Sequence, residues 1–447
     1  MMFFAFILIF ILVSIVSLKT QRKTNSSQTY FVANKEIGMF ALIATLVMTE
    51  LNTSTLLGFT SLGAIYGSSA VSLALVFLVG LLFYAISVAK KWKGFDGVSV
   101  TTFFKRRYNN TIGYIAASIL LVAMIGFSAN YIKSLTLIFM PLFPSLNEWV
   151  LSGIFCIVML VISLRGGIRT IIRLDILSFL ITIVVVPLWL YYAVSFEEVS
   201  DVVVHTESFS TSVLISLVII TMFTYILAPW YGQKMFTAKT SKVAFLSVIV
   251  AAILITLIYG IAILSVSLVA KKIAINIQAQ EVFPYLINHQ LPKFLQGITY
   301  AVLFFIATTT IVGIWNTISS IVVAHNHKAI HNTSLKRSIF ITLGVALLTY
   351  LLANLFIDQI FEKMVLMNIP ISALAFSLLG GFFWKRVNVL ASLISIVVGV
   401  AGGVFCYFYF GEQNYMWYWA MYVIPSSFLS GVVFTFIGQP FFNKERI

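Results

Sequence analysis

The chain has 447 residues, of which 60% are hydrophobic and only 9% are charged, and its mean hydropathy is +1.03. A soluble protein of this size would be about 25% charged, so the composition excludes a soluble enzyme and a disordered regulator. The long apolar runs also exclude an outer-membrane barrel, whose strands alternate apolar and polar residues. Cys156 and Cys406 lie within apolar runs, which is typical of small core residues and not of a disulfide or a metal site.

Thirteen segments are apolar enough to cross a membrane, which takes about 20 residues for a helix. In chain order they are 2–18, 37–66, 69–89, 111–140, 148–164, 170–196, 212–236, 241–270, 295–324, 336–357, 364–384, 387–410 and 415–438. Basic residues follow the 2–18 run and none precedes it. A cleavable signal peptide has the opposite polarity, so we expect a retained N-terminal helix.

The net charge of +14 is explained by the loops between these segments. If the N-terminus lies outside, the cytoplasmic segments hold 23 of the 28 basic residues, Lys234 among them. This follows the positive-inside rule. The sequence therefore predicts a multi-pass protein of the plasma (bacterial inner) membrane with a cytoplasmic C-terminus, and the basic excess does not indicate nucleic-acid binding.

The chain is expected to form one membrane domain without a soluble module. We divide it into an extra N-terminal helix and loop (1–36), a ten-helix transport core (37–384), and two C-terminal helices with a short tail (385–447). The sequence has no G-x-x-x-x-G-K-[ST] motif, which argues against an ATP-powered pump.

Glu50 is the acidic residue that lies near the centre of a predicted span. It belongs to a polar run, Thr49–Thr55 (TELNTST), within the apolar segment 37–66. Ionisable groups at this depth mark a pathway or site by default, and residues of these types weaken a helix. The run therefore predicts a broken helix whose free carbonyls and half-helix N-terminus bind ions. A polar contact between helices is the alternative, but it leaves Glu50 unexplained.

A second interruption is predicted in the segment 212–236, at Tyr225–Gln233 (YILAPWYGQ). Pro229 removes a backbone donor in mid-span and frees a carbonyl. The neighbouring Tyr225 and Trp230 would then line a pocket or gate. A simple proline kink, with Trp230 near the cytoplasmic interface, is the alternative.

Three consecutive hydroxyls, Thr308, Thr309 and Thr310, stand at mid-depth in the segment 295–324. Hydroxyl oxygens suit a hard cation such as sodium. The alternative is that they bond back to carbonyls one turn earlier.

The two interrupted segments lie five helices apart, and this spacing predicts a 5+5 inverted repeat of the transporter type.

Four stretches carry a resemblance to the sodium:solute symporter family, from about residue 30 to 435. They are Tyr30–Gly38 (YFVANKEIG), Arg165–Gly167 followed by Asp175, Gln233–Lys239 (QKMFTAK, against the family's Gln-Arg-x-x-x-Ala-Lys), and the segment holding Asn316, Ser319 and Ser320. The resemblance implies an all-α fold of the leucine-transporter type with thirteen transmembrane helices. The first and sixth core helices would be broken.

The resemblance also implies one sodium ion, bound by the carbonyls of Met48 and Leu51 and the hydroxyls of Thr309 and Thr310. The family's second sodium site uses serines where this chain has Val312 and Gly313, so Asp175 is expected to lack that ion. Pro229 resembles the amino-acid branch more than the sugar branch. The residues expected around the solute, or coupled to it, are Glu50, Asn52, Ser54, Thr55, Tyr131, Tyr225, Pro229 and Trp230.

We therefore expect a secondary transporter, not an enzyme. It would carry a small polar solute, an amino acid or organic acid more than a sugar, together with Na⁺ by alternating access. Its partners are the solute, the ion and the bilayer, with no other cofactor. Three alternatives stay open: a proton-coupled transporter using Glu50, a sodium-independent transporter, and a non-transporting sensor of the same fold.

Overall fold

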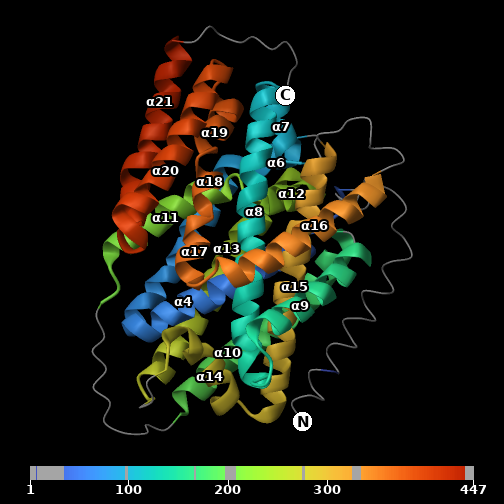
Figure 1. Cartoon of the computed structure of the whole chain (residues 1–447), viewed down its shortest axis with the longest axis vertical. Helices are drawn as coiled ribbons and strands as arrows, with labels where there is room; N and C mark the ends of the chain where they lie inside the picture. Colours follow the sequence, from blue (N-terminus) through green and yellow to red (C-terminus); the bar gives the residue numbers. More distant parts are fainter. Residues whose placement is uncertain are drawn as a thin grey trace.

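The structure of the protein is a computed structural model that describes Ile7 and residues 35–95, 99–165, 168–196, 208–273, 277–324 and 334–437 (Figure 1). Within these ranges the chain is helical and contains no named strand, and one isolated bridge pairs Ile37 with Ala238. The expected N-terminal helix at 2–18 lies outside the described residues except for Ile7.

The helices of the described part alternate between long spans and short pieces. The α-helices are α3 (Met39–Glu50), α4 (Thr53–Tyr66), α5 (Ala74–Tyr84), α6 (Lys90–Gly94), α7 (Thr101–Arg107), α8 (Asn110–Phe139), α9 (Glu148–Arg165), α10 (Ile168–Val194), α11 (Thr211–Tyr225), α12 (Pro229–Thr237), α13 (Ser241–Ala270), α14 (Val282–Tyr285), α15 (Lys293–Ala324), α16 (Ser334–Leu355), α17 (Ile360–Leu366), α18 (Asn368–Ser372), α19 (Ala375–Phe383), α20 (Val389–Tyr418) and α21 (Ile424–Ile437). Short 3₁₀ or π turns connect them at η2 (Gly67–Leu73), η3 (Ala85–Ala89), η4 (Met140–Leu142), η5 (Ala279–Glu281), η6 (Leu286–Gln290) and η8 (Trp419–Val423).

Eight helices of the described part are long and apolar enough to span a membrane, or nine if the bent pair α11 and α12 counts as one. Three shorter apolar helices lie at Met39–Glu50, Glu148–Leu164 and Ile339–Leu355. The number falls below the expected thirteen partly because α3 is only half of an interrupted span. An all-helical, multi-span architecture is confirmed, and the number thirteen stays a prediction.

Both predicted breaks are present. α3 ends at Glu50 and α4 begins at Thr53, so two residues separate the half-helices. α11 ends at Tyr225 and α12 begins at Pro229, with a bend of 50° between them. Proline is well tolerated at the first position of a helix because the N–H it lacks has no partner there. The bend is therefore a true interruption, not a kink within one helix.

Two later segments differ from the sequence-based expectation. The segment expected as one helix at 364–384 is divided into α17, α18 and α19, in keeping with Pro370, which has no N–H to continue the ladder. α20 runs on past the expected end at 410, and Gly411 interrupts it with a φ of 73°. That left-handed conformation is easily adopted by glycine, and the chain changes direction there.

The two breaks lie at the centre of the bundle. α13 packs against α3, α4, α5 and α10, and α15 packs against α8, α10 and α16. Among the described spans α15 is the most enclosed, with 89% of its apolar window buried. In Figure 1 the long α8 runs between the flank formed by α20 and α21 and the flank formed by α9 and α16. The helix breaks and α15 are therefore shielded from lipid.

Candidate ion and solute site at the helix breaks

The break between α3 and α4 is held by Asn52. Its side-chain oxygen accepts a hydrogen bond from the N–H of Thr55 (2.8 Å), which caps α4, and its amide donates to the carbonyl of Glu50 (3.0 Å). Its backbone N–H also bonds the Glu50 carbonyl (2.7 Å), whereas a continuous helix would direct it to the carbonyl of Met48. Asn52 therefore interrupts this helix, and the Met48 carbonyl does not accept the Asn52 N–H as it would in a continuous helix.

Glu50 is buried at the end of α3, with 6% of the residue exposed. The hydroxyl of Tyr225, the last residue of α11, donates a hydrogen bond to its carboxylate. The hydroxyl of Tyr259 on α13 donates to its backbone carbonyl (2.6 Å). Buried charges require such partners, so Glu50 connects the two broken helices directly.

The threonines of α15 face the first break. The hydroxyl of Thr310 lies 3.4 Å from the carbonyl of Met48 and also bonds back to the carbonyl of Ile306 (2.8 Å). Thr308 bonds back to Phe304 (2.7 Å) and Thr309 contacts Ile306 (3.4 Å). The hydroxyls of all three threonines therefore contact carbonyls of the preceding turn of α15. The Thr310 hydroxyl also reaches α3, and an oxygen pair from two helices is the kind of ligand that sodium takes.

The second break exposes a carbonyl that a side chain then binds. Trp92 of α6 donates its indole N–H to the carbonyl of Ile226 (2.9 Å). Trp230 and Tyr231 are buried, at 8% and 0% exposure, so neither side chain is exposed at the protein surface. Trp230 instead packs edge-on against Phe127 of α8, with ring centroids 5.5 Å apart.

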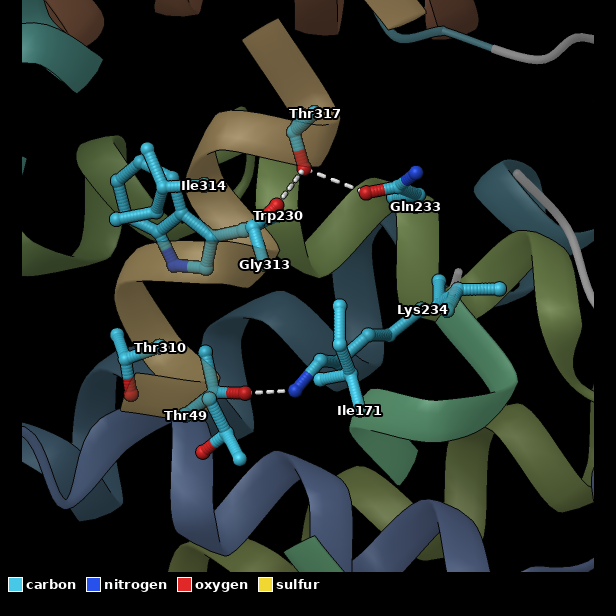
Figure 2. Close-up of a pocket in the computed structure, with 11 residues that line it drawn as sticks. Thr49, Ile171, Trp230, Gln233, Lys234, Thr310, Gly313, Ile314 and Thr317 are labelled. Atoms are coloured by element: carbon cyan, nitrogen blue, oxygen red, sulfur yellow. Dashed lines mark hydrogen bonds between the residues drawn. The ribbon is translucent and has the colours of Figure 1, made fainter. Parts of the chain in front are cut away.

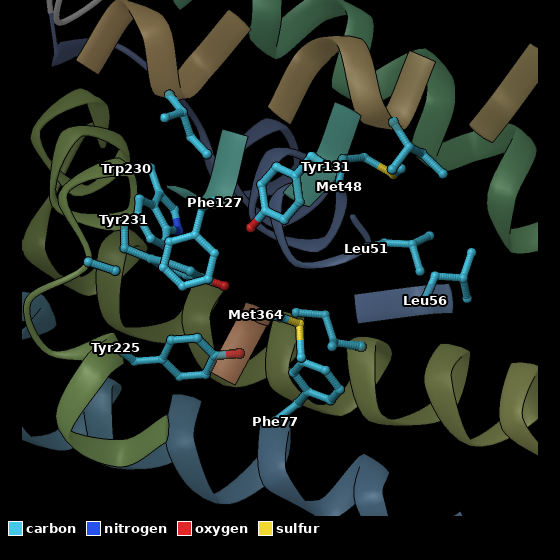
Figure 3. Close-up of a cluster of buried hydrophobic side chains, with 14 of the residues drawn as sticks. Met48, Leu51, Leu56, Phe77, Phe127, Tyr131, Tyr225, Trp230, Tyr231 and Met364 are labelled. Carbon is cyan, nitrogen blue, oxygen red and sulfur yellow. The ribbon is translucent and has the colours of Figure 1, made fainter. Parts of the chain in front are cut away.

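Aromatic side chains from several helices pack together beside the breaks (Figure 3). Tyr131 and Phe127 come from α8, Tyr225 comes from α11, and Met364 of α17 lies between them and α4. Thr55 contacts the sulfur of Met364 through its hydroxyl (3.2 Å). We call Phe127, Tyr131, Tyr225, Trp230 and Met364 the aromatic cluster. Its members are buried and mostly apolar.

The remaining expected residues are buried here in different ways. Ser54 is fully buried, and among the described residues its hydroxyl has no hydrogen-bond partner. Leu51 stands at the break, where its N–H bonds the carbonyl of Val47 (2.9 Å). The backbone carbonyl of Tyr131 accepts a hydrogen bond from the hydroxyl of Thr53 (3.2 Å). Asn52 has the clearest structural role of the set, because both ends of its amide are used within the break.

A second buried pair of charged side chains, which the sequence does not predict, lies next to this site. Asp175 of α10 is 1% exposed, and Lys234 of α12 is 7% exposed. Their side chains lie 3.5 Å apart. The assignment of Lys234 to the cytoplasmic segments is wrong, because α12 carries this residue into the bundle. Glu50 is likewise not the only buried acid. The basic residues of QKMFTAK resemble a membrane flank, and only the fold buries the first of them, Lys234.

Comparison with known proteins identifies the family of this chain. The model of the sodium:solute symporter family matches residues 30–399. The chain belongs to this family. Comparison with curated protein sequences gave no significant match.

Two solved transporter structures share the fold. One is the substrate-bound, outward-open state of a Na⁺-coupled sialic acid symporter, with a TM-score of 0.83 at 14% identity and coverage of 98% of each chain. The other is a nucleobase-cation-symport-1 family transporter in a closed conformation with bromovinylhydantoin bound. It has a TM-score of 0.57 at 11% identity, over 92% of this chain and 96% of that one. Both have the leucine-transporter fold.

The family assignment confirms several expectations from the sequence. The chain is a multi-pass membrane transporter and not an enzyme. It carries out Na⁺-coupled symport, with Na⁺ as the coupling ion and no other cofactor indicated. The ion and a solute are therefore its transported partners.

Proposed function

We propose that this symporter moves a small solute bearing an amino group, such as an amino acid, across the plasma membrane by alternating access. The contact between Tyr225 and Glu50 carries the proposal, because it places a buried carboxylate between the two broken helices. In this architecture solutes and ions bind at such breaks. Glu50 contacts Tyr225 of the aromatic cluster and lies two residues after Met48, whose carbonyl faces Thr310.

The charges of the site favour an amine over an organic acid. Glu50 supplies a buried carboxyl group at the first break, and Lys234 is a buried basic side chain on the neighbouring α12. The ammonium of Lys234 is held by Thr45, Thr49 and Asp175. A solute carboxylate would therefore find the Lys234 ammonium already engaged, whereas a solute ammonium would be paired with Glu50 and in contact with aromatic faces. A neutral sugar would leave Glu50 without a charged partner.

We place the sodium ion at the carbonyls of Met48 and Leu51 and the hydroxyls of Thr309 and Thr310. Three observations support this site: the bonding of the Asn52 N–H to Glu50, the contact of Thr310 with the Met48 carbonyl, and the burial of all four residues. The solute would lie beside Glu50, Ser54, Thr55, Tyr131, Tyr225 and Trp230, with Asn52 and Pro229 shaping the two breaks.

We propose the N-out, C-in orientation for thirteen spans arranged as a 5+5 inverted repeat and two C-terminal helices. Segments expected at the cytoplasmic face do contact one another. Arg107 donates to the carbonyls of Trp384 (3.3 Å) and Lys385 (3.1 Å). Lys93 lies 3.5 Å from the carbonyl of Phe236. These contacts agree with the distribution of basic residues, and the division at 37–384 and 385–447 follows from the same span order.

The test is uptake by the full chain reconstituted in proteoliposomes. A panel of labelled amino acids, organic acids and sugars is offered under an inward Na⁺ gradient, with choline replacing Na⁺ in the control. We expect an amino-bearing solute to be taken up only with Na⁺. Uptake that follows a pH gradient in the absence of Na⁺ would instead favour the proton-coupled alternative, and uptake of sugars alone would contradict the solute class.

A further inference from the structure

The ammonium of Lys234 lies inside the transport core among oxygen atoms of the protein, which we call the oxygen site. The ammonium donates to the backbone carbonyl of Thr45 at 2.7 Å, and to the hydroxyl of Thr49. The carboxylate of Asp175 lies at 3.5 Å and also accepts the hydroxyl of Thr45. The set of a carbonyl, a hydroxyl and a carboxylate contains only oxygen ligands, and hard cations prefer such ligands.

This oxygen site adjoins the place proposed for sodium. Thr49 directly follows Met48, whose carbonyl faces Thr310. A small cavity of about 20 Å³ lies between the oxygen site and the proposed sodium position. Its walls include Lys234, Thr49, Thr309 and Thr310 (Figure 2). That volume accommodates about one water-sized particle. An ion leaving the sodium position in this direction would therefore meet the lysine ammonium.

We propose that the Lys234 ammonium is a tethered cation that competes with the transported sodium ion for Asp175 and the neighbouring oxygens. In the arrangement seen here the lysine neutralises Asp175 and repels sodium, which promotes release of the ion. When sodium binds, the lysine side chain withdraws, and its long flexible stem permits this movement. The inference rests on the proposed sodium site and adds the group that sets how tightly the ion is held.

The test uses charge-changing variants of the full chain and equilibrium ²²Na⁺ binding in detergent, without any solute. Lys234→Met removes the competing charge, and we expect Na⁺ to bind about tenfold more tightly because like-charge repulsion is lost. Asp175→Asn leaves the lysine without its counter-charge, so Na⁺ should bind about tenfold more weakly. The double variant K234M/D175N should return close to the wild-type affinity.

Lys242→Met is the matched control, because Lys242 is exposed at the start of α13. We expect it to bind Na⁺ as the wild type does. The double variant also guards against misfolding, since it leaves neither charge unpaired in the core.

A purely structural role predicts a different pattern. If Lys234 only supports the fold, K234M, D175N and the double variant all bind Na⁺ more weakly, and this result overturns the proposal. Unchanged affinity in K234M would overturn it as well. Absence of Na⁺ binding by the wild type would remove the proposed sodium site itself, and the inference with it.

Discussion

The hydroxyl of Tyr225 donates a hydrogen bond to the carboxylate of Glu50 across the two broken helices of the bundle. One residue ends α11 and the other ends α3. A movement of either half-helix therefore changes the surroundings of a buried charge. We propose that this contact links the two breaks during alternating access, so that solute or ion binding at one break shifts the conformation of the other.

We predict that Tyr225→Phe lowers Na⁺-coupled uptake. The change keeps the ring and removes the donor to Glu50, an interaction with a charged group that contributes about 1.5–3 kcal/mol. Initial uptake rates at several solute concentrations should show a loss of about 10-fold or more in transport efficiency. Tyr191→Phe is the control, since Tyr191 is 62% exposed. Equal rates in both variants would show that the contact has no part in transport.

Glu50→Gln should abolish recognition of an amino-bearing solute while leaving the protein folded. Glutamine retains the size of glutamate and accepts the Tyr225 hydrogen bond, but it lacks the negative charge. We expect solute affinity, measured by isothermal calorimetry in Na⁺, to fall by at least about tenfold. A variant that binds the solute as tightly as the wild type would place Glu50 outside the solute site.

Thr310→Ala should weaken sodium binding selectively. Loss of one oxygen ligand to a cation is expected to raise the Na⁺ concentration for half-maximal uptake by about 10-fold or more, whereas Thr310→Ser should preserve it. Thr308→Ala serves as the control, because the Thr308 hydroxyl bonds only the carbonyl of Phe304 among the described residues. If the Thr308 variant is the one impaired, the proposed ligand set is wrong.

Asn52→Ala is predicted to destabilise the break between α3 and α4. Removal of a side-chain cap costs about 0.5–2 kcal/mol, and the Glu50 carbonyl also loses a donor. Thermal unfolding in detergent should show a lower midpoint for this variant. Asn52→Ser, which restores a capping oxygen, should recover most of the stability. Full stability in the alanine variant would leave Asn52 free for a direct role in solute binding.

Cysteine labelling tests the orientation. In a background where Cys156 and Cys406 are replaced by alanine, single cysteines are introduced at the exposed positions Lys271 and Lys385. In right-side-out vesicles an impermeant maleimide should label the Lys271→Cys variant directly. It should label the Lys385→Cys variant only after permeabilisation. The reverse pattern would contradict the N-out assignment.

The breaks were predictable because local chemistry produces them. Asn52 caps α4 through a residue three positions away, and Pro229 starts α12, so short stretches of sequence contain the whole cause. The aromatic cluster was predictable only in part. Tyr131 and Trp230 were expected, but Phe127 and Met364 are ordinary apolar residues whose position beside the site depends on how α8 and α17 pack.

By itself the sequence determined the membrane environment, the alternation of basic loops and the two interruptions, because hydropathy and helix breaking are properties of neighbouring residues. Only the tertiary structure decided where the remaining charges lie. Lys234 resembles a flanking basic residue in the chain, yet α12 carries it to within 3.5 Å of Asp175. A pair separated by 59 residues is created by packing, and the cost of burying either charge alone explains why the two occur together.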